Sequence, residues 1–167
     1  MKENKDERPV LKIKLTLTDR LLEMFGWLIL ILLWTWLLVD FSSFPEIIPL
    51  HYNLAGQPDS FRNNALIFSI LSTVLFVGMT LLNKFPHVFN YPKKITNQNA
   101  ERQYTIATRL VRYLKFIVVF TFSIVVFMTA PAEGGIATCP GSWFILIFIG
   151  LIYVPMTFAI VKLFKVP

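Results

Sequence analysis

The sequence predicts an all-α membrane protein with four transmembrane helices and both termini in the cytoplasm. Three observations support this prediction: the abundance of apolar residues, their arrangement in long uncharged runs, and the uneven distribution of lysine and arginine. The chain of 167 residues is 55% hydrophobic and only 16% charged, whereas about a quarter of an average soluble protein is charged. A soluble domain of this length could not bury so much apolar surface.

The uncharged runs locate the four helices. They cover residues 24–39, 63–83, 116–132 and 134–161, and a helix needs roughly 20 residues to cross the hydrocarbon core. The first run is long enough if Glu23 and Asp40 mark the two interfaces, and the third if Lys115 snorkels to the headgroups. We therefore expect helices at about 21–41, 64–83, 113–131 and 142–163, within one transmembrane domain of residues 21–164. Pro155 should kink the last helix.

Lysine and arginine set the expected orientation. Fifteen basic residues lie in the N-terminal tail 1–20, the segment 84–115 and the C-terminal end, whereas the loop between the first two helices holds only Arg62. The positive-inside rule places the basic regions in the cytoplasm. This topology, together with anionic inner-leaflet lipid as a partner, accounts for the net charge of +6, so no nucleic-acid partner is expected.

The cytoplasmic segments differ in their patterns. Residues 1–8 form a charged tail that is predicted to be disordered, and residues 10–18 alternate apolar and polar side chains, as an extended segment on the headgroups would. Thr18 and Asp19 are candidate N-caps for the first helix. After a proline-containing loop at 84–95, a long amphipathic helix is expected to begin at Thr96 and to continue into the third transmembrane helix.

The basic segment before the third helix is a candidate lipid- or partner-binding surface. Its arginines lie on faces of the amphipathic helix other than the apolar one, and its lysines follow aromatic residues suited to headgroup depth. The segment would bind anionic lipid or a cytoplasmic regulator; simple anchoring at the interface is the alternative. The candidate residues are Asn90, Lys93, Lys94, Arg102, Arg109 and Arg112.

The loop between the first two helices, with the sequence IPLHYNLAGQPD at 48–59, is a candidate ligand-binding site outside the cytoplasm. The candidate residues are His51, Asn53, Asp59 and Arg62. Asp59 could instead cap the second helix, and the whole loop could be a rigid polar lid that binds nothing. A metal site would need more ligands than these, so we expect neither a metal nor another cofactor.

The sequence gives little support to an enzyme. It lacks the Gly-x-Ser-x-Gly, His-Glu-x-x-His and Gly-rich phosphate-loop motifs. No ionisable residue is expected at mid-membrane, where transporters place them, and the single Cys139 excludes an internal disulfide. We therefore favour a non-catalytic sensor or protective binding protein. The alternative is a structural or accessory subunit of a membrane transporter or enzyme complex.

Two stretches resemble a known family. The loop pattern PxxIPLHYNLAGQPDSF and the later block NKFPHVFNYPKKITNQNAERQY are similar to the bacterial integral membrane family known as domain of unknown function 1648, over about residues 18–130. The same domain forms the N-terminal part of immunity membrane proteins for sporulation-delaying-protein-type toxins. The resemblance therefore implies an inner-membrane location and an immunity-like role. Where family members often have a lysine in the outside loop, this chain has Arg62-Asn63-Asn64.

Overall fold

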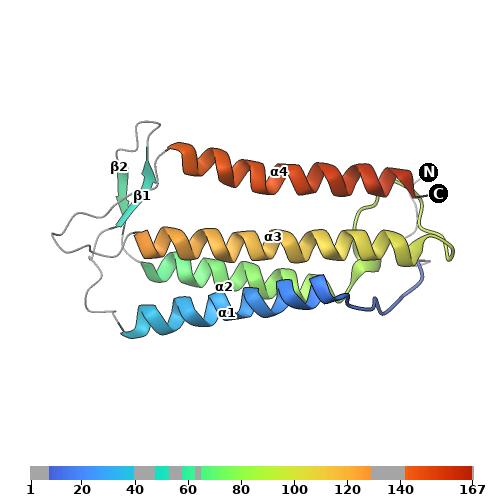
Figure 1. Cartoon of the computed structure of the whole chain (residues 1–167), viewed down its shortest axis with the longest axis horizontal. Helices are drawn as coiled ribbons and strands as arrows, with labels where there is room; N and C mark the ends of the chain where they lie inside the picture. Colours follow the sequence, from blue (N-terminus) through green and yellow to red (C-terminus); the bar gives the residue numbers. More distant parts are fainter. Residues whose placement is uncertain (1–7, 40–47, 53–57, 63–64, 129–141, 167) are drawn as a thin grey trace.

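The computed structural model describes residues 8–39, 48–52, 58–62, 65–128 and 142–166. Its four α-helices run alternately in opposite directions, and a short 3-10 helix lies between the second and the third (Figure 1). Two strands between the first two helices pair in an antiparallel hairpin. The elements are α1 (Leu17–Val39), β1 (Ile48–Tyr52), β2 (Pro58–Arg62), α2 (Ala65–Leu82), η3 (Pro86–Val88), α3 (Ala100–Met128) and α4 (Ser142–Lys165).

The four predicted helices are all present. The predicted ends agree with those of α1, α2 and α4 to within four residues. Helix α3 joins most of the predicted amphipathic part to residues 113–128 of the predicted span 113–131, whose last three residues lie outside the described residues. Within the described part of the chain, α1, α3 and α4 are long and apolar enough to cross a membrane, whereas α2 is a shorter apolar helix. The structure departs from a purely helical fold only at the β1–β2 hairpin, where an irregular loop was expected.

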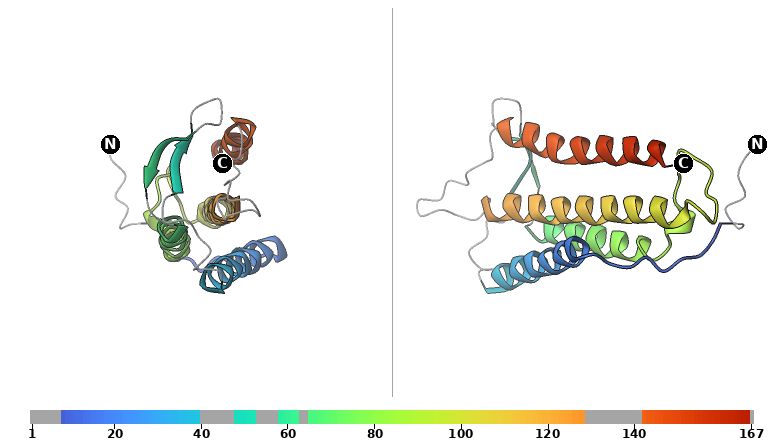
Figure 2. Two further views of the ribbon diagram at one scale, coloured as in Figure 1. Left: turned by 90° about the vertical axis from the view of Figure 1, so that its left-hand side faces the viewer. Right: turned by 45° about the vertical axis from the view of Figure 1, so that its right-hand side comes forward.

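Helix α3 is the centre of the bundle. Helices α1 and α2 both pack against it, and α4 lies against its other side (Figure 2). The core between the first three helices is built from Leu30, Leu33, Leu37, Phe76, Val119 and Val126. Helix α4 is peripheral, because only 6% of its apolar span is buried, compared with 33% for α3. An apolar outer surface of this extent is what a bundle surrounded by lipid requires.

The described chain has two distinct poles (Figure 1). One, the hairpin pole, carries β1 and β2. The other, which we call the basic pole, carries residues 8–16, residues 83–99 and the C-terminal end of α4. Both ends of the described chain therefore lie at the basic pole.

Similar caps begin α1 and α3. Thr16 Oγ1 accepts a hydrogen bond from the Asp19 amide (3.4 Å), and Asp19 Oδ2 accepts one from the Thr16 amide (2.9 Å). Thr96 and Asn99 exchange the corresponding bonds at 3.3 and 2.9 Å, one turn before the first residue of α3. This is the reciprocal arrangement of a capping box. The cap of α1 is thus Thr16 rather than the predicted Thr18 or Asp19. The third helix was predicted to begin at Thr96; its capping box starts there, but the first residue of α3 is Ala100, four residues later.

The N-terminal segment lies across the first turns of α3. Leu11 and Ile13 pack against a buried cluster of Ile95, Ala100 and Tyr104, while Lys12 and Lys14 between and after them are exposed. The predicted alternation of residues 10–18 is therefore seen only at 11–14, because Leu15 and Leu17 are exposed and residues 17 and 18 belong to α1 rather than to an extended segment. The prediction of a disordered tail through residue 8 fails at its last residue, because Arg8 is buried, with 7% exposure.

Candidate functional site

The hairpin gathers three of the four predicted ligand residues. His51 lies in β1 opposite Ser60, Arg62 lies in β2 opposite Ile48, and Asp59 belongs to β2. Asp59 therefore does not cap α2, which begins six residues later at Ala65. The fourth predicted residue, Asn53, lies outside the described residues. The register is irregular on both sides of His51, so this position interrupts regular pairing.

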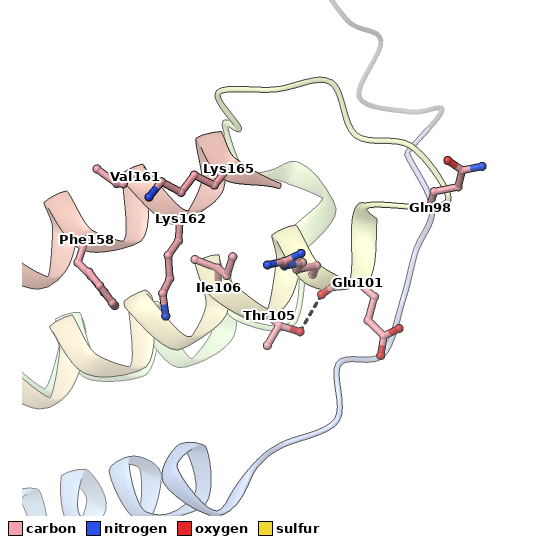
Figure 3. A pocket seen from close by; sticks show the side chains of 9 residues that line it. Gln98, Glu101, Thr105, Ile106, Phe158, Val161, Lys162 and Lys165 are labelled. Atoms are coloured by element: carbon pink, nitrogen blue, oxygen red, sulfur yellow. Dashed lines mark hydrogen bonds between the residues drawn. The ribbon is translucent and has the colours of Figure 1, made fainter. Parts of the chain in front are cut away.

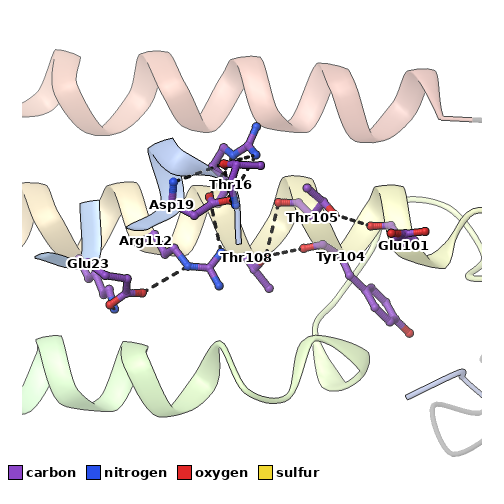
Figure 4. Close-up of polar contacts among 10 residues, drawn as sticks. Thr16, Asp19, Glu23, Glu101, Tyr104, Thr105, Thr108 and Arg112 are labelled. Atoms are coloured by element: carbon purple, nitrogen blue, oxygen red, sulfur yellow. Dashed lines mark hydrogen bonds and ion pairs between the residues drawn. The ribbon is translucent and has the colours of Figure 1, made fainter. Parts of the chain in front are cut away.

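A set of five charged side chains joins α1 to α3 at the end nearer the basic pole (Figure 4). We call it the α1–α3 seam. Its residues are Asp19 and Glu23 on α1 and Arg109, Arg112 and Lys115 on α3. Spacings of four on α1 and three on α3 place each set along one face of its helix, so the acids face the bases along the contact between the two helices.

The ion pairs of the seam form a continuous chain. Asp19 Oδ1 lies 3.1 Å from Arg109 Nε and 3.7 Å from Arg112 Nη1. Glu23 then bridges the two inner bases, with Oε1 3.3 Å from Arg112 Nε and Oε2 2.6 Å from Lys115 Nζ. The seam becomes drier along its length, because the exposed side-chain fraction falls from 43% for Arg109 to 8% for Arg112 and 0% for Lys115.

Helix α2 closes the buried end of the seam. Lys115 Nζ donates to Thr80 Oγ1 at 2.7 Å as well as to Glu23, and it lies 4.7 Å from the centre of the Phe76 ring. The Thr80 hydroxyl in turn donates to the Phe76 carbonyl at 2.7 Å. An ammonium has three N–H donors, so two are taken by oxygen acceptors while the cation also contacts the negative face of an aromatic ring.

These contacts correct two sequence-based expectations. Lys115 does not snorkel to the headgroups, because Glu23, Thr80 and Phe76 surround it and leave it fully buried. Arg112 is also buried (6% exposed) rather than on an outward polar face of α3. Any role of Arg109 and Arg112 in binding lipid or a partner stays a prediction, and both guanidinium groups are engaged by acids within the protein.

The other four predicted lipid- or partner-binding residues lie at the surface of the basic pole. Asn90, Lys93, Lys94 and Arg102 are all exposed. Lys93 Nζ donates to the Val166 carbonyl at 2.8 Å, so one of these lysines reaches the last residues of α4. Arg102 lines a groove between α3 and α4. The structure therefore separates the predicted set into two arginines that pair with acids of α1, of which only Arg112 is buried, and four surface residues.

A tightly packed layer of the basic pole was not predicted. Arg8 donates to the carbonyls of His87 (3.1 Å) and Phe89 (2.6 Å), and its guanidinium lies 5.6 Å from the centre of the Tyr91 ring. Burial raises the pKa of Tyr91, so its phenol stays protonated and donates to the Pro86 carbonyl at 2.8 Å. The N-terminal segment is thus fastened to the loop that precedes α3.

Comparison with known proteins finds a family model that matches the hairpin and parts of the two helices beside it. Residues 28–77 match the family model described as Domain of unknown function (DUF1648), which confirms the family resemblance of this region. An uncharacterised protein of Archaeoglobus fulgidus is 33% identical over 88 residues, which are 47% of this chain and 48% of that protein. The chain thus matches about half the length of this curated relative. No solved structure matches the chain.

Proposed function

We propose that this chain belongs to the domain of unknown function 1648 family and is a non-catalytic, multi-pass protein of the bacterial inner membrane. It acts as a sensor or as a protective, immunity-like binding protein. The loop 45–62 binds a protein or peptide ligand outside the cytoplasm, and the basic pole meets anionic lipid or a cytoplasmic regulator.

The observation that carries this proposal is the position of the hairpin. It lies between α1 and α2, at the centre of the matched domain of residues 28–77 and at the pole opposite the basic one (Figure 1). The described part of the sheet has two strands, so each strand has an outer edge with which an extended peptide could pair. The family that this loop resembles also supplies the N-terminal part of toxin immunity membrane proteins, and this link favours a peptide toxin as the ligand.

A fourth membrane span at α2 is part of the proposal. Its 18 residues measure about 27 Å at 1.5 Å per residue, close to the roughly 30 Å of a bilayer core. Its outward face carries Ile67, Ile70, Leu71, Val74, Leu75 and Leu81, all exposed, whereas the small Ser69 and Ser72 are buried. Apolar residues outside and small polar residues inside are the pattern of a helix that faces lipid.

The orientation follows from the poles. The described basic residues at the ends of the helices lie at the basic pole, with the exception of Arg62 in β2. By the positive-inside rule this pole, with both termini, faces the cytoplasm. A cysteine at Ser60, introduced into a Cys139→Ser background, should react with a membrane-impermeant maleimide added to intact cells, whereas a cysteine at Thr96 should react only after lysis. Labelling of Thr96 in intact cells would overturn the orientation.

The alternative function, an accessory subunit, is favoured by one observation. Helix α4 buries only 6% of its apolar span, and Leu146 on this helix is 70% exposed. A subunit of a larger complex could dock a partner helix there, whereas a sensor would contact its ligand through the hairpin.

Photo-crosslinking in intact cells distinguishes the two functions. A benzophenone amino acid at Ser60 should form an adduct with a protein or peptide, and the same group at Leu146 should react mainly with lipid. His51→Ala should abolish the Ser60 adduct without changing the melting temperature of the purified protein. A protein adduct at Leu146 with none at Ser60 would instead establish the accessory subunit.

A further inference from the structure

A groove with a volume of about 680 Å³ lies between the first turns of α3 and the last turns of α4 (Figure 3). Its basic lining residues are Arg102 from α3 and Lys162 and Lys165 from α4. Its apolar lining residues include Ile106, Phe158 and Val161. The groove thus combines three cations with an apolar wall at the basic pole.

The three cations of the groove have no carboxylate partner among the residues that the structure describes, in contrast to the three bases of the seam. One acid, Glu101, belongs to the lining, but its side chain points away from Lys162 and Lys165 (Figure 3). Lys162 is held at the groove because its ammonium lies 4.4 Å from the centre of the Phe158 ring. The groove therefore presents a net positive charge to the outside.

Helix α4 ends in a fixed position beside the groove. Gln103 Nε2 donates to the Leu163 carbonyl at 3.2 Å, and Lys93 Nζ donates to the Val166 carbonyl at 2.8 Å. These side chains satisfy carbonyls that the end of a helix leaves without partners. Lys162 and Lys165 are consequently not needed for the C-cap, and both residues are exposed.

The groove continues into an apolar pocket of about 210 Å³ toward the middle of the bundle. The two cavities share Ile106, Phe158 and Lys162. The second is also lined by Leu22, Leu110 and Pro155, so that α1, α3 and α4 all contribute. A ligand that fills both cavities would have an anionic group at the basic pole and an apolar chain directed away from it.

We propose that the α3–α4 groove binds the headgroup phosphate of an anionic phospholipid, with an acyl chain in the apolar continuation. Arg102 supplies a planar fork for phosphate oxygens, and the two lysines supply point charges. A soluble phosphate would match these charges but would leave the apolar side chains of the groove exposed to water, so the lipid is the better occupant. The proposal rests on the proposed placement of the basic pole at the inner leaflet.

Lipid titration followed by native mass spectrometry tests the proposal on the full chain in detergent. The probe is phosphatidylglycerol, compared with phosphatidylcholine. Neutralising the groove in Arg102→Gln/Lys162→Gln/Lys165→Gln should weaken phosphatidylglycerol binding by about tenfold or more, since each basic side chain near anionic lipid contributes about fivefold. The matched control is Lys12→Gln/Lys14→Gln/Lys84→Gln. It removes three exposed charges at the same pole that do not line the groove, and it should weaken binding clearly less than the groove variant, because solvent and salt screen charges that do not contact the headgroup.

Two results would overturn the proposal. Equal losses in both triple variants would mean that the basic pole attracts lipid only through its total charge. Competition by glycerol phosphate at the same concentration as the lipid would mean that the groove binds the free anion. Because binding is measured on purified protein, failure here leaves the crosslinking and labelling tests of the proposed function unaffected.

Discussion

The α1–α3 seam and the α3–α4 groove each hold three basic side chains near the basic pole, but in opposite states. Every base of the seam lies within 3.7 Å of a carboxylate oxygen, whereas the bases of the groove have no such partner in the described structure. The difference comes from the partner helices. Helix α1 presents Asp19 and Glu23 to α3, while the sequence of α4 contains no acid. The acids of α1 thus allow Arg112 and Lys115 of α3 to be buried. Because α4 has no acid, the cations of the groove can bind an external anion.

The first and largest prediction concerns the loss of the carboxylate at the buried end of the seam. Glu23→Gln removes the carboxylate that holds both Arg112 and Lys115, and a buried charge that loses its partner costs about 3–5 kcal/mol. We expect a loss of stability of about 3 kcal/mol, measured by chemical denaturation in detergent. The control is Arg20→Gln on the same helix, where the side chain is exposed and the change should stay within about 0.5 kcal/mol.

The double variant Glu23→Gln/Lys115→Met sharpens this test. It removes both charges, so it should recover much of the loss, because replacing both partners of a buried pair is often close to neutral. Equal stability of Glu23→Gln and Arg20→Gln would show that the seam does not hold α1 against α3.

The second prediction concerns the close contact between Gly26 of α1 and Phe76, the ring that Lys115 of the seam also contacts. A Cβ added at Gly26 of α1 would lie 2.6 Å from Phe76 Cε2, and this ring is fully buried, next to Trp27 and Lys115. Gly26→Ala should therefore cost about 1–3 kcal/mol through overpacking.

The matched control for Gly26→Ala is Gly78→Ala on α2. Apart from the adjacent backbone of α2 itself, no atom lies within 4 Å of a Cβ added at Gly78, so alanine there should stabilise the helix by about 0.5–1 kcal/mol. Thermal melts of the two variants should move in opposite directions. A stabilising effect of Gly26→Ala would contradict the close approach of α1 to Phe76.

The third prediction separates the observed cap of α1 from the expected one. Thr16→Ala removes the hydroxyl that accepts from the Asp19 amide and that also accepts from Arg109 Nη2 at 3.1 Å, so it should cost about 1 kcal/mol. Thr18→Ala changes an exposed residue within the helix and should cost less than about 0.5 kcal/mol. Equal losses of unfolding free energy in the two variants, measured by denaturation, would contradict the assignment of the cap to Thr16 and favour Thr18.

Much of the fold was predictable from the sequence because one signal dominates it. Uncharged runs of membrane length locate the helices, and the alternation at 10–18 correctly separates Leu11 and Ile13 from the exposed lysines. The cap of α1 was misplaced by two residues because Thr16, Thr18 and Asp19 are all capable caps. The hairpin was missed because Pro49 and Pro58 lie in its strands, and proline disfavours strands.

The seam was not predicted because its pairs join residues about 90 positions apart, such as Asp19 with Arg109 and Glu23 with Lys115. A single sequence does not indicate which faces of two helices meet. A signal was nevertheless present, since Glu23 and Lys115 have opposite charges at the edges of two apolar runs, and charges in such places usually pair. The groove depends in addition on the docking of α4 beside the first turns of α3, which no pattern in either segment specifies.

The most direct test of the difference between seam and groove is the melting temperature of two variants in two kinds of nanodisc. In phosphatidylcholine alone, Glu23→Gln should melt well below the wild type. The groove variant Arg102→Gln/Lys162→Gln/Lys165→Gln should melt at the same temperature as the wild type. Added phosphatidylglycerol should then raise the melting temperature of the wild type and of Glu23→Gln, because a ligand of the folded state stabilises that state. The groove variant should gain little. A groove variant that melts low in phosphatidylcholine, or that gains as much as the wild type from phosphatidylglycerol, would contradict the account.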